Sequence, residues 1–238
     1  MLGAHGRVAI YAAPRPDDPL WTFGSAVIGY DAASGEAVPR TPPLGLTHEC
    51  WAALTADPRR YGFHATLKAP FRLRDRFDIG RLSEAVRLFS DGAQALAPFA
   101  LDVRAIGEFL ALVPTSAPGE LHSFAASVVT SFDPFRAPLS AGERQRRLAA
   151  GLSEQQIGNL DQWGYPYVLD EFRFHMSLTG KIRDETLRSE LKDALAESFL
   201  YETGTVEFTL EALVLFVQHA LDAPFLIHGR HKLNGHLV

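Results

Sequence analysis

The sequence is poor in cysteine and contains no long apolar run, and both absences narrow the classes of protein that fit it. Cys50 is the single cysteine, so the chain can form neither an intramolecular disulfide nor a cluster of thiolate ligands for zinc. No apolar stretch approaches the roughly 20 residues that cross a bilayer, and the segment from Met1 to Ala13 lacks the pattern of a cleaved signal peptide. We therefore expect a cytoplasmic protein that has no membrane partner.

An excess of positive charge is also missing. The chain carries 23 Lys and Arg residues against 28 Asp and Glu, which gives a formal net charge of −5. Binding to an extended nucleic acid through many phosphate contacts is therefore not favoured, whereas a small anionic ligand fits. A hydrophobic share of 47% is typical of a folded globular protein, and the composition leaves the oligomeric state unknown.

Short apolar runs alternate with helical patterns along most of the chain, and proline, glycine and aspartate mark the borders between them. In chain order, the patterns predict a strand at Arg7 to Ala12, helices at Asp18 to Gly29 and Thr47 to Ala56, a strand at Phe63 to Lys68, a helix that Asp78 caps, strands at Phe99 to Val103 and Phe109 to Val113, a helix at Pro118 to Phe132, a strand at Phe172 to Leu178, a helix at Asp184 to Leu200, and strands at Val206 to Ala212, Leu213 to Gln218 and Phe225 to His231.

The order of a strand, a helix and two strands occurs twice, which indicates a weak internal duplication. The tetrapeptide that starts at Phe99 follows His64 by 35 residues, and a matching one that starts at Phe208 follows His175 by 33. Each unit would cover one face of its sheet with helices and leave the other face free. The two free faces would then define a cleft.

The first copy carries three polar side chains on one face of its predicted strand. Because side chains alternate along a strand, His64, Thr66 and Lys68 share a face, and Phe63 and Leu67 point the other way. A hydrogen-bonded structural histidine is the alternative for His64. A solvated charge at the end of the strand is the alternative for Lys68.

The second copy repeats this arrangement. Arg173, His175 and Ser177 share a face, opposite Phe174 and Met176. A solvated surface charge is again the alternative for Arg173. Nevertheless, two Phe-His-apolar-hydroxyl-Leu runs in the same context favour a site over two unrelated structural histidines.

An imidazole, a hydroxyl and a cation on each strand suit phosphodiester chemistry. Cleavage needs a base, an acid and donors for the phosphate oxygens, and histidine can serve as base or acid near neutral pH. We expect His64 and His175 to act as base and acid in an order that the sequence does not assign. Thr66 and Ser177 would bind the phosphate, and Lys68 or Arg173 would balance its charge.

The motifs resemble those of the 2H phosphoesterases, a family named for two His-x-Thr/Ser motifs. Three runs look like the DUF1045-type bacterial branch, and the resemblance covers nearly the whole chain. The runs are Leu-Trp-Thr-Phe-Gly-Ser at 20–25, Arg-Tyr-Gly-Phe-His-Ala-Thr-Leu-Lys at 60–68 and Trp-Gly-Tyr-Pro-Tyr-Val-Leu-Asp-Glu-Phe-Arg-Phe-His-Met at 163–176. Ser177 stands where many relatives have threonine, which keeps the hydroxyl.

The resemblance implies an α+β fold with two pseudo-symmetric lobes, each an antiparallel sheet with helices on its outer face, around a central cleft. We expect a single bilobal domain over residues 1–238, with lobe 1 at roughly 6–132, a linker or insertion at roughly 133–164 and lobe 2 at roughly 165–238; the first strand is the one expected to cross between lobes. The implied activity is hydrolysis or transfer at phosphodiesters, often cyclic ones, in phosphonate metabolism.

Aromatic residues supply the remaining candidates for the cleft. Tyr11 and Tyr167 are candidates to stack on a base or sugar, whereas we expect Tyr165, beside a proline, to pack as a loop anchor. Gln218 ends a strand that corresponds to a cleft-lining strand in the resembling family, and simple exposure is the alternative.

The last three histidines suggest a metal site at first sight. However, the spacing of His228, His231 and His236 fits no standard ligand set, and no cysteine or carboxylate joins them. We interpret them as part of a C-terminal surface strand, and we expect neither a metal nor another cofactor.

The leading hypothesis is therefore a metal-independent cyclic phosphodiesterase that acts on a small phosphorylated sugar or nucleotide. A rival from another class is a binding module that senses a phosphorylated metabolite or an RNA end without turnover. A third reading is RNA end-processing or end-joining, which would need a basic channel that the net charge does not suggest.

Overall fold

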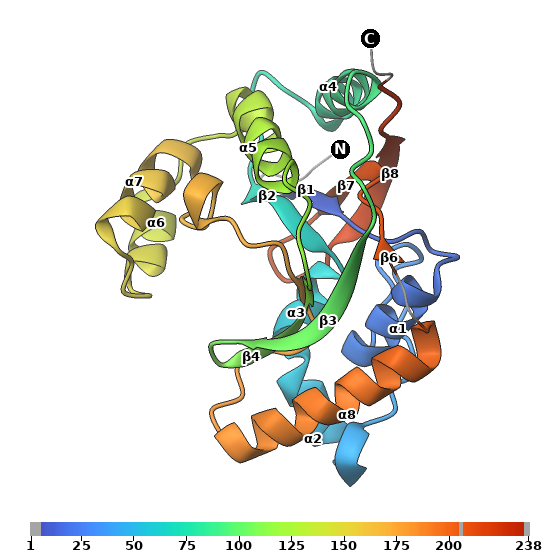
Figure 1. Cartoon of the computed structure of the whole chain (residues 1–238). Coiled ribbons are helices and arrows are strands. Elements are labelled where there is room, and N and C mark those ends of the chain that lie inside the picture. The colour runs from blue at the N-terminus through green and yellow to red at the C-terminus, as the bar shows by residue number, and fades with distance from the viewer. Residues whose placement is uncertain (1–5, 205–206, 236–238) are drawn as a thin grey trace.

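A computed structural model describes residues 6–204 and 207–235 as an eight-stranded antiparallel sheet with helices packed against it (Figure 1). The strands lie in the order β6-β3-β4-β5-β2-β1-β7-β8. Their bounds are β1 Arg7–Ala12, β2 Ala65–Phe71, β3 Phe99–Ile106, β4 Phe109–Pro114, β5 Met176–Ser177, β6 Glu207–Phe208, β7 Ala212–Gln218 and β8 Leu226–Lys232. The predicted α+β class is confirmed.

The helices begin and end mostly where capping residues predict. Asp18 caps α1 and Gly29 ends it in the left-handed conformation, while Asp78 caps α4. The helices are α1 Pro19–Ile28, α2 His48–Leu54, α3 Ala56–Tyr61, α4 Ile79–Asp91, α5 Leu121–Phe132, α6 Ala141–Leu148, α7 Glu154–Trp163 and α8 Glu185–Thr203. In Figure 1, α4 and α5 lie at one end of the molecule and α8 lies at the other, with strands between them. In the part of the chain that the structure describes, no helix is both long and apolar enough to cross a membrane.

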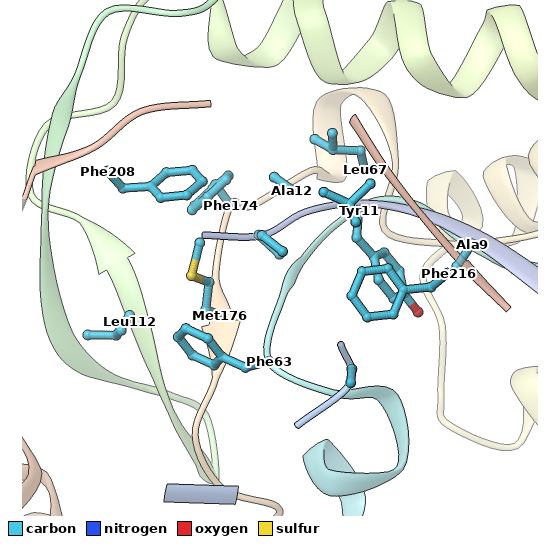
Figure 2. Packing of buried hydrophobic residues seen from close by; sticks show 14 of the residues in the cluster. Ala9, Tyr11, Ala12, Phe63, Leu67, Leu112, Phe174, Met176, Phe208 and Phe216 are labelled. Carbon is cyan, nitrogen blue, oxygen red and sulfur yellow. The ribbon is translucent and has the colours of Figure 1, made fainter. Parts of the chain in front are cut away.

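The two strands that follow the histidines are neighbours in the middle of the sheet. Ala65 in β2 pairs with Met176 in β5, and this pair joins the two halves of the sheet. Met176 and Phe63 are fully buried and lie in the same apolar cluster (Figure 2). Residues more than a hundred positions apart in the sequence thus meet across one strand pair.

Each half of the sheet contains strands from both the early and the late parts of the chain. β3 and β4 lie beside β5 and β6, whereas β1 and β2 lie beside β7 and β8. Phe99 pairs with Phe208, so the two matching tetrapeptides of the duplication lie next to each other. The division into two lobes by residue number stays a prediction.

Several predicted boundaries are wrong. The strand predicted at Phe172 to Leu178 shrinks to β5, and at its predicted start the carbonyl of Phe172 accepts a hydrogen bond from His122 Nε2 of α5 at 3.2 Å. The strand predicted at Val206 to Ala212 reduces to β6, with Val206 itself outside the described residues.

The sequence also missed one helix. The sequence predicts no helix between Ala56 and Phe63, yet α3 forms there, with Pro58 in its first turn, where the missing N–H would have no intrahelical partner. The predicted linker at 133–164 contains α6 and α7, which pack beside each other on one side of the molecule (Figure 1).

Candidate active site

His64 lies directly before β2, and the backbone fixes the orientation of its ring. Its Nδ1 donates to the carbonyl of Gly62 at 2.9 Å, which leaves Nε2 as the basic nitrogen. Nε2 lies 3.2 Å from Thr66 Oγ1, two residues along the same face. The ring of Tyr11 from β1 stacks on the imidazole with a centroid distance of 3.6 Å.

His175 repeats this local geometry directly before β5. Its Nδ1 donates to the carbonyl of Arg173 at 2.8 Å, again two residues upstream. No hydrogen bond of its Nε2 occurs within residues 6–204 and 207–235, and the ring of Phe109 lies 5.7 Å away between centroids. The two histidines therefore present the same nitrogen in the same way.

Both motifs open into one cavity of about 370 Å³. His64, Thr66, His175 and Ser177 all line it, and so does Tyr11. The cavity is within the size range of small-molecule sites. The structure thus brings together five of the eight side chains that the sequence predicts for the site.

The pairing of the strands explains this convergence. Tyr11 of β1 pairs with Thr66 of β2, and Ser177 of β5 pairs with Ala111 of β4, so these side chains share one face of the sheet. Met176 and Ala65 point to the opposite face, into the core.

Burial keeps both imidazoles neutral. Desolvation lowers the pKa of His64 to about 3; the Gly62 carbonyl opposes this shift and the nearby His175 adds to it. Desolvation also lowers the pKa of His175, opposed by its hydrogen bond to Arg173. Near neutral pH both Nε2 atoms are therefore unprotonated bases in the free protein.

Two further predicted residues line an adjoining cavity of about 400 Å³. Tyr167 and Arg173 line this second cavity, which shares Thr66, Phe109 and His175 with the first. Both side chains are exposed. They thus lie near His175, in a cavity that adjoins the one of the two histidines.

The prediction that Lys68 shares a face with His64 is wrong. A bulge shifts the register between β1 and β2, so that Lys68 pairs with Ile10 and points to the opposite face of the sheet. There its Nζ donates to the carbonyl of Val129 at 3.0 Å and lies 3.3 Å from Asp133 Oδ1. Desolvation lowers the pKa of Lys68 to about 8, and Asp133 counters this shift. The space beside Lys68 measures only about 30 Å³, room for little more than water.

Two other expectations also change. Gln218 neither lines the cavities described above nor is exposed; it is fully buried, and its Oε1 accepts from Arg7 Nε at 2.7 Å. Tyr165, expected to pack as a loop anchor, lines both cavities and is only partly buried.

The late histidines lie away from this site. His228 is exposed on β8, at the edge of the sheet, and His231 Nε2 lies 3.3 Å from Ser83 Oγ. His236 is outside the described residues. Among the residues that the structure describes, no group of three or more His, Cys, Asp or Glu side chains is arranged to hold a metal ion.

Sequence reasoning missed Arg7, Tyr61 and Arg147, which line the cavity of the histidines. Strand parity would have found Arg7, because it lies four residues before Tyr11 on the same face of β1. Arg147 comes from α6, and nothing in the sequence shows that this helix faces the site.

Comparison with known proteins gives a family and two kinds of relative. A family model described as "Protein of unknown function (DUF1045)" matches residues 66–226. Two curated relatives are both named ribose 1,5-bisphosphate phosphokinase PhnN. The one from Janthinobacterium sp. (strain Marseille) is 36% identical over 231 residues, which are 96% of this chain and 51% of that protein. The one from Laribacter hongkongensis (strain HLHK9) is 32% identical over 225 residues, 92% of this chain and 50% of that protein.

This chain therefore spans about half the length of the curated relatives it matches. Among solved structures, Usb1 of Kluyveromyces marxianus is similar with 12% identity, coverage of 93% of this chain and 97% of that chain, and a TM-score of 0.40. A second Usb1 structure from the same organism, with uridine monophosphate, has 11% identity and a TM-score of 0.39, and covers 94% of this chain and 98% of that one.

Proposed function

This chain belongs to the DUF1045 family, and from that premise and the geometry of the site we propose that it is a metal-independent phosphodiesterase that opens a small cyclic phosphate ester. The family match confirms the branch that the motifs resemble. The proposed catalytic residues are His64 and His175, with Thr66 and Ser177 as donors to the phosphate.

One observation carries the proposal, namely the repeated geometry of the two histidines. Each Nδ1 is held by a carbonyl two residues upstream, and both rings line one cavity together with a hydroxyl two residues downstream. A structural histidine satisfies its nitrogens within the core. Two rings fixed in the same way around one hollow instead suit a pair that exchanges protons with a ligand.

The proposed reaction adds water across one P–O bond of the cyclic diester. One histidine Nε2 removes a proton from water as the oxygen attacks phosphorus, and the other donates a proton to the ester oxygen that leaves. The product is a phosphomonoester with a free hydroxyl. The hydroxyls of Thr66 and Ser177 would stabilise the charge on the non-bridging oxygens.

The name of the curated relatives suggests a first substrate. Ribose 1,5-bisphosphate carries a phosphate at C1 beside the C2 hydroxyl, so opening the 1,2-cyclic phosphate of ribose 5-phosphate at O2 would yield that compound. The present chain contains no Gly-x4-Gly-Lys-Ser/Thr run, the phosphate loop of many kinases. The absence of this motif supports a reaction that produces ribose 1,5-bisphosphate over one that phosphorylates it. The family resemblance implies that the reaction belongs to phosphonate metabolism.

The test is turnover of cyclic phosphates followed by phosphorus NMR. We expect the wild-type protein to open a ribose 1,2-cyclic phosphate or a nucleoside 2′,3′-cyclic phosphate, and His64→Ala or His175→Ala to lower kcat at least about 100-fold. His228→Ala is the matched control, because this histidine is exposed on β8 and lies outside the cavity. Activity should persist in excess chelator.

Two outcomes would count against the proposal. Loss of activity in chelator would reject the metal-independent mechanism. Tight binding of these phosphates by calorimetry, with no hydrolysis of any of them, would favour a binding module that senses a phosphorylated metabolite.

A further inference from the structure

Two arginines from different elements line the cavity of the histidines. Arg7 lies on β1, on the same face as Tyr11, and Arg147 lies in the last turn of α6. Neither guanidinium has a part in the two-histidine chemistry. Both are partly buried.

The arginines are held in place by neutral groups and not by acids. Arg7 Nε donates to Gln218 Oε1 at 2.7 Å, and its guanidinium carbon lies 5.4 Å from the centre of the Phe225 ring. The guanidinium of Arg147 lies 5.4 Å from the centre of the Tyr165 ring. Within residues 6–204 and 207–235, neither arginine forms an ion pair with a carboxylate, whereas Lys68, Arg72 and Arg136 each do.

The acidic residues nearby are placed elsewhere. Glu143, one turn before Arg147, caps α6 and lies 3.4 Å from Arg72. Asp57 lines the cavity but pairs with neither arginine, and Lys181, which also lines it, pairs with Glu108 at 3.4 Å. Glu143 still acts on Arg147 through its charge, but within residues 6–204 and 207–235 neither arginine is paired directly with a carboxylate.

The two guanidiniums also act on each other. Burial lowers the pKa of Arg147 most, and the positive charge of Arg7 adds to this shift, while Tyr165, Tyr61 and Glu143 oppose it. Bringing like charges toward one hollow costs free energy, which a bound anion would offset.

A third donor points to the same ligand. The hydroxyl of Tyr11 is fully buried and has no hydrogen-bond partner in the described part of the chain, although the ring lines the cavity. Burial raises the pKa of this phenol well above its usual value, so it stays a neutral donor. A buried donor without a partner is uncommon, although Ser25, Ser90 and Trp163 share this state, and a ligand that brings an acceptor into the cavity would satisfy the Tyr11 hydroxyl.

We propose that Arg7 and Arg147 form a second anion subsite that binds a phosphomonoester group carried by the same substrate whose cyclic phosphate meets the histidines. Planar guanidiniums match the oxygens of phosphate, and two of them suit a dianion. The substrate class becomes a cyclic phosphate that bears a further phosphate at another position. This inference rests on the proposed function for the link between the two groups, but the subsite itself is tested apart from turnover.

The kinetic test compares two cyclic phosphates that differ only in the second phosphate, such as adenosine 2′,3′-cyclic phosphate and its 5′-phosphorylated form, and the corresponding pair of ribose 1,2-cyclic phosphates. We expect wild type to prefer the phosphorylated member by about 10-fold to 100-fold in kcat/KM. Arg147→Met should reduce this ratio toward one, because it keeps an apolar stem over Tyr165 and removes the charge. Arg147→Lys should retain part of the ratio.

Arg146→Met is the matched control. Arg146 precedes Arg147 on α6, is exposed and lines none of the cavities described above, so its loss should leave the ratio at the wild-type value. A wild-type ratio near one, or a ratio that Arg147→Met does not change, would overturn the subsite while the proposed function stands.

The binding test uses ribose 5-phosphate, which has no cyclic phosphate, in calorimetry with the full chain. Wild type should bind it at least about 10-fold more tightly than Arg7→Gln or Arg147→Met, and Arg146→Met should bind it like wild type. If no cyclic phosphate is hydrolysed but this pattern holds, the proposed function fails and the subsite stands. Equal affinities in wild type and both arginine variants would overturn the proposed subsite. Thermal melts of each variant show whether the fold is retained.

Discussion

At the scale of single residues, the neutral state of the two imidazoles sets the pH dependence of the proposed reaction. One must be unprotonated and the other protonated, so the active form carries one proton on the pair. With the pKa of His64 at about 3 and that of His175 below its usual value of 6.5, this form of the free protein is most populated below pH 6.5.

We therefore expect kcat/KM for a cyclic diester without a second phosphate to fall as pH rises above about 6.5. Bound phosphate stabilises an imidazolium, so the falling limb of kcat should lie at a higher pH than that of kcat/KM. Steady-state rates between pH 4 and pH 9 check both limbs. A kcat/KM that increases from pH 6.5 to pH 8 would contradict the lowered pKa values, because it would mean that the general base loses its proton only above pH 6.5.

The same burial predicts acid-sensitive stability. Below about pH 6.5 His64 binds a proton in the unfolded state, whereas in the folded state it binds one only near pH 3. The free energy of unfolding therefore decreases as pH falls through this window. The loss is at most about 1.4 kcal/mol per pH unit. Between pH 7 and pH 5, the free energy of unfolding of His64→Gln should decrease by up to about 2 kcal/mol less than that of wild type. Urea denaturation at each pH measures this difference, and His228→Gln should behave like wild type.

Strand parity predicted the site residues only where the ladder is regular. Thr66 and Ser177 lie on the expected face because their strand pairs keep register next to the histidines. Lys68 lies beyond a bulge, which reverses its face. A bulge depends on the partner strand, so no pattern within Phe63 to Lys68 reveals it.

At the scale of elements, α6 is a helix without a buried residue that carries a proposed ligand-binding residue. Polar contacts hold it, namely a capping box of Ser140 and Glu143 and a two-pronged pair between Arg144 and Asp161 at 2.6 Å and 2.9 Å. Such exposed contacts are each worth little. The position of Arg147 therefore depends on the cap more than on packing.

Ser140→Ala should accordingly loosen α6 by about 1 kcal/mol and weaken the preference for a doubly phosphorylated substrate. Hydrogen exchange of residues 141–148 should become faster while the global melting temperature changes little. Ser153→Ala is the control, because it removes the same kind of capping box from α7, which does not carry Arg147. An unchanged substrate preference in Ser140→Ala would show that other contacts position Arg147.

The sequence predicted helix boundaries well where capping residues set them, but it predicted strand boundaries poorly where tertiary pairing sets them. Asp18, Gly29 and Asp78 end their helices as local chemistry dictates. β5 begins only at Met176, and Phe172, where the strand was predicted to start, bonds instead to His122 of α5, a partner 50 residues away. The residues around Phe172 do not indicate such a partner.

At the scale of the whole molecule, the strand order was the least predictable feature. The duplication indicated two similar units, and the resemblance implied two lobes around a cleft. In the sheet, β3 and β4 lie next to β5 and β6, so each half contains strands from both copies. The order of the strands in the sheet depends on long-range burial and not on any periodicity along the chain.

The mixed order predicts that the two parts of the chain cannot fold separately. A fragment of residues 1–150 would have β1 to β4 without β5 to β8, which would expose the edge of β1 that pairs with β7 and the edge of β4 that pairs with β5. We expect this fragment and its complement, residues 151–238, each to lack a cooperative urea transition. Mixed together, they should regain the transition and the turnover of the intact protein, since the break falls in the exposed turn at Gly151. A cooperative transition of the fragment 1–150 alone would instead show that a lobe defined by residue number is an independent folding unit.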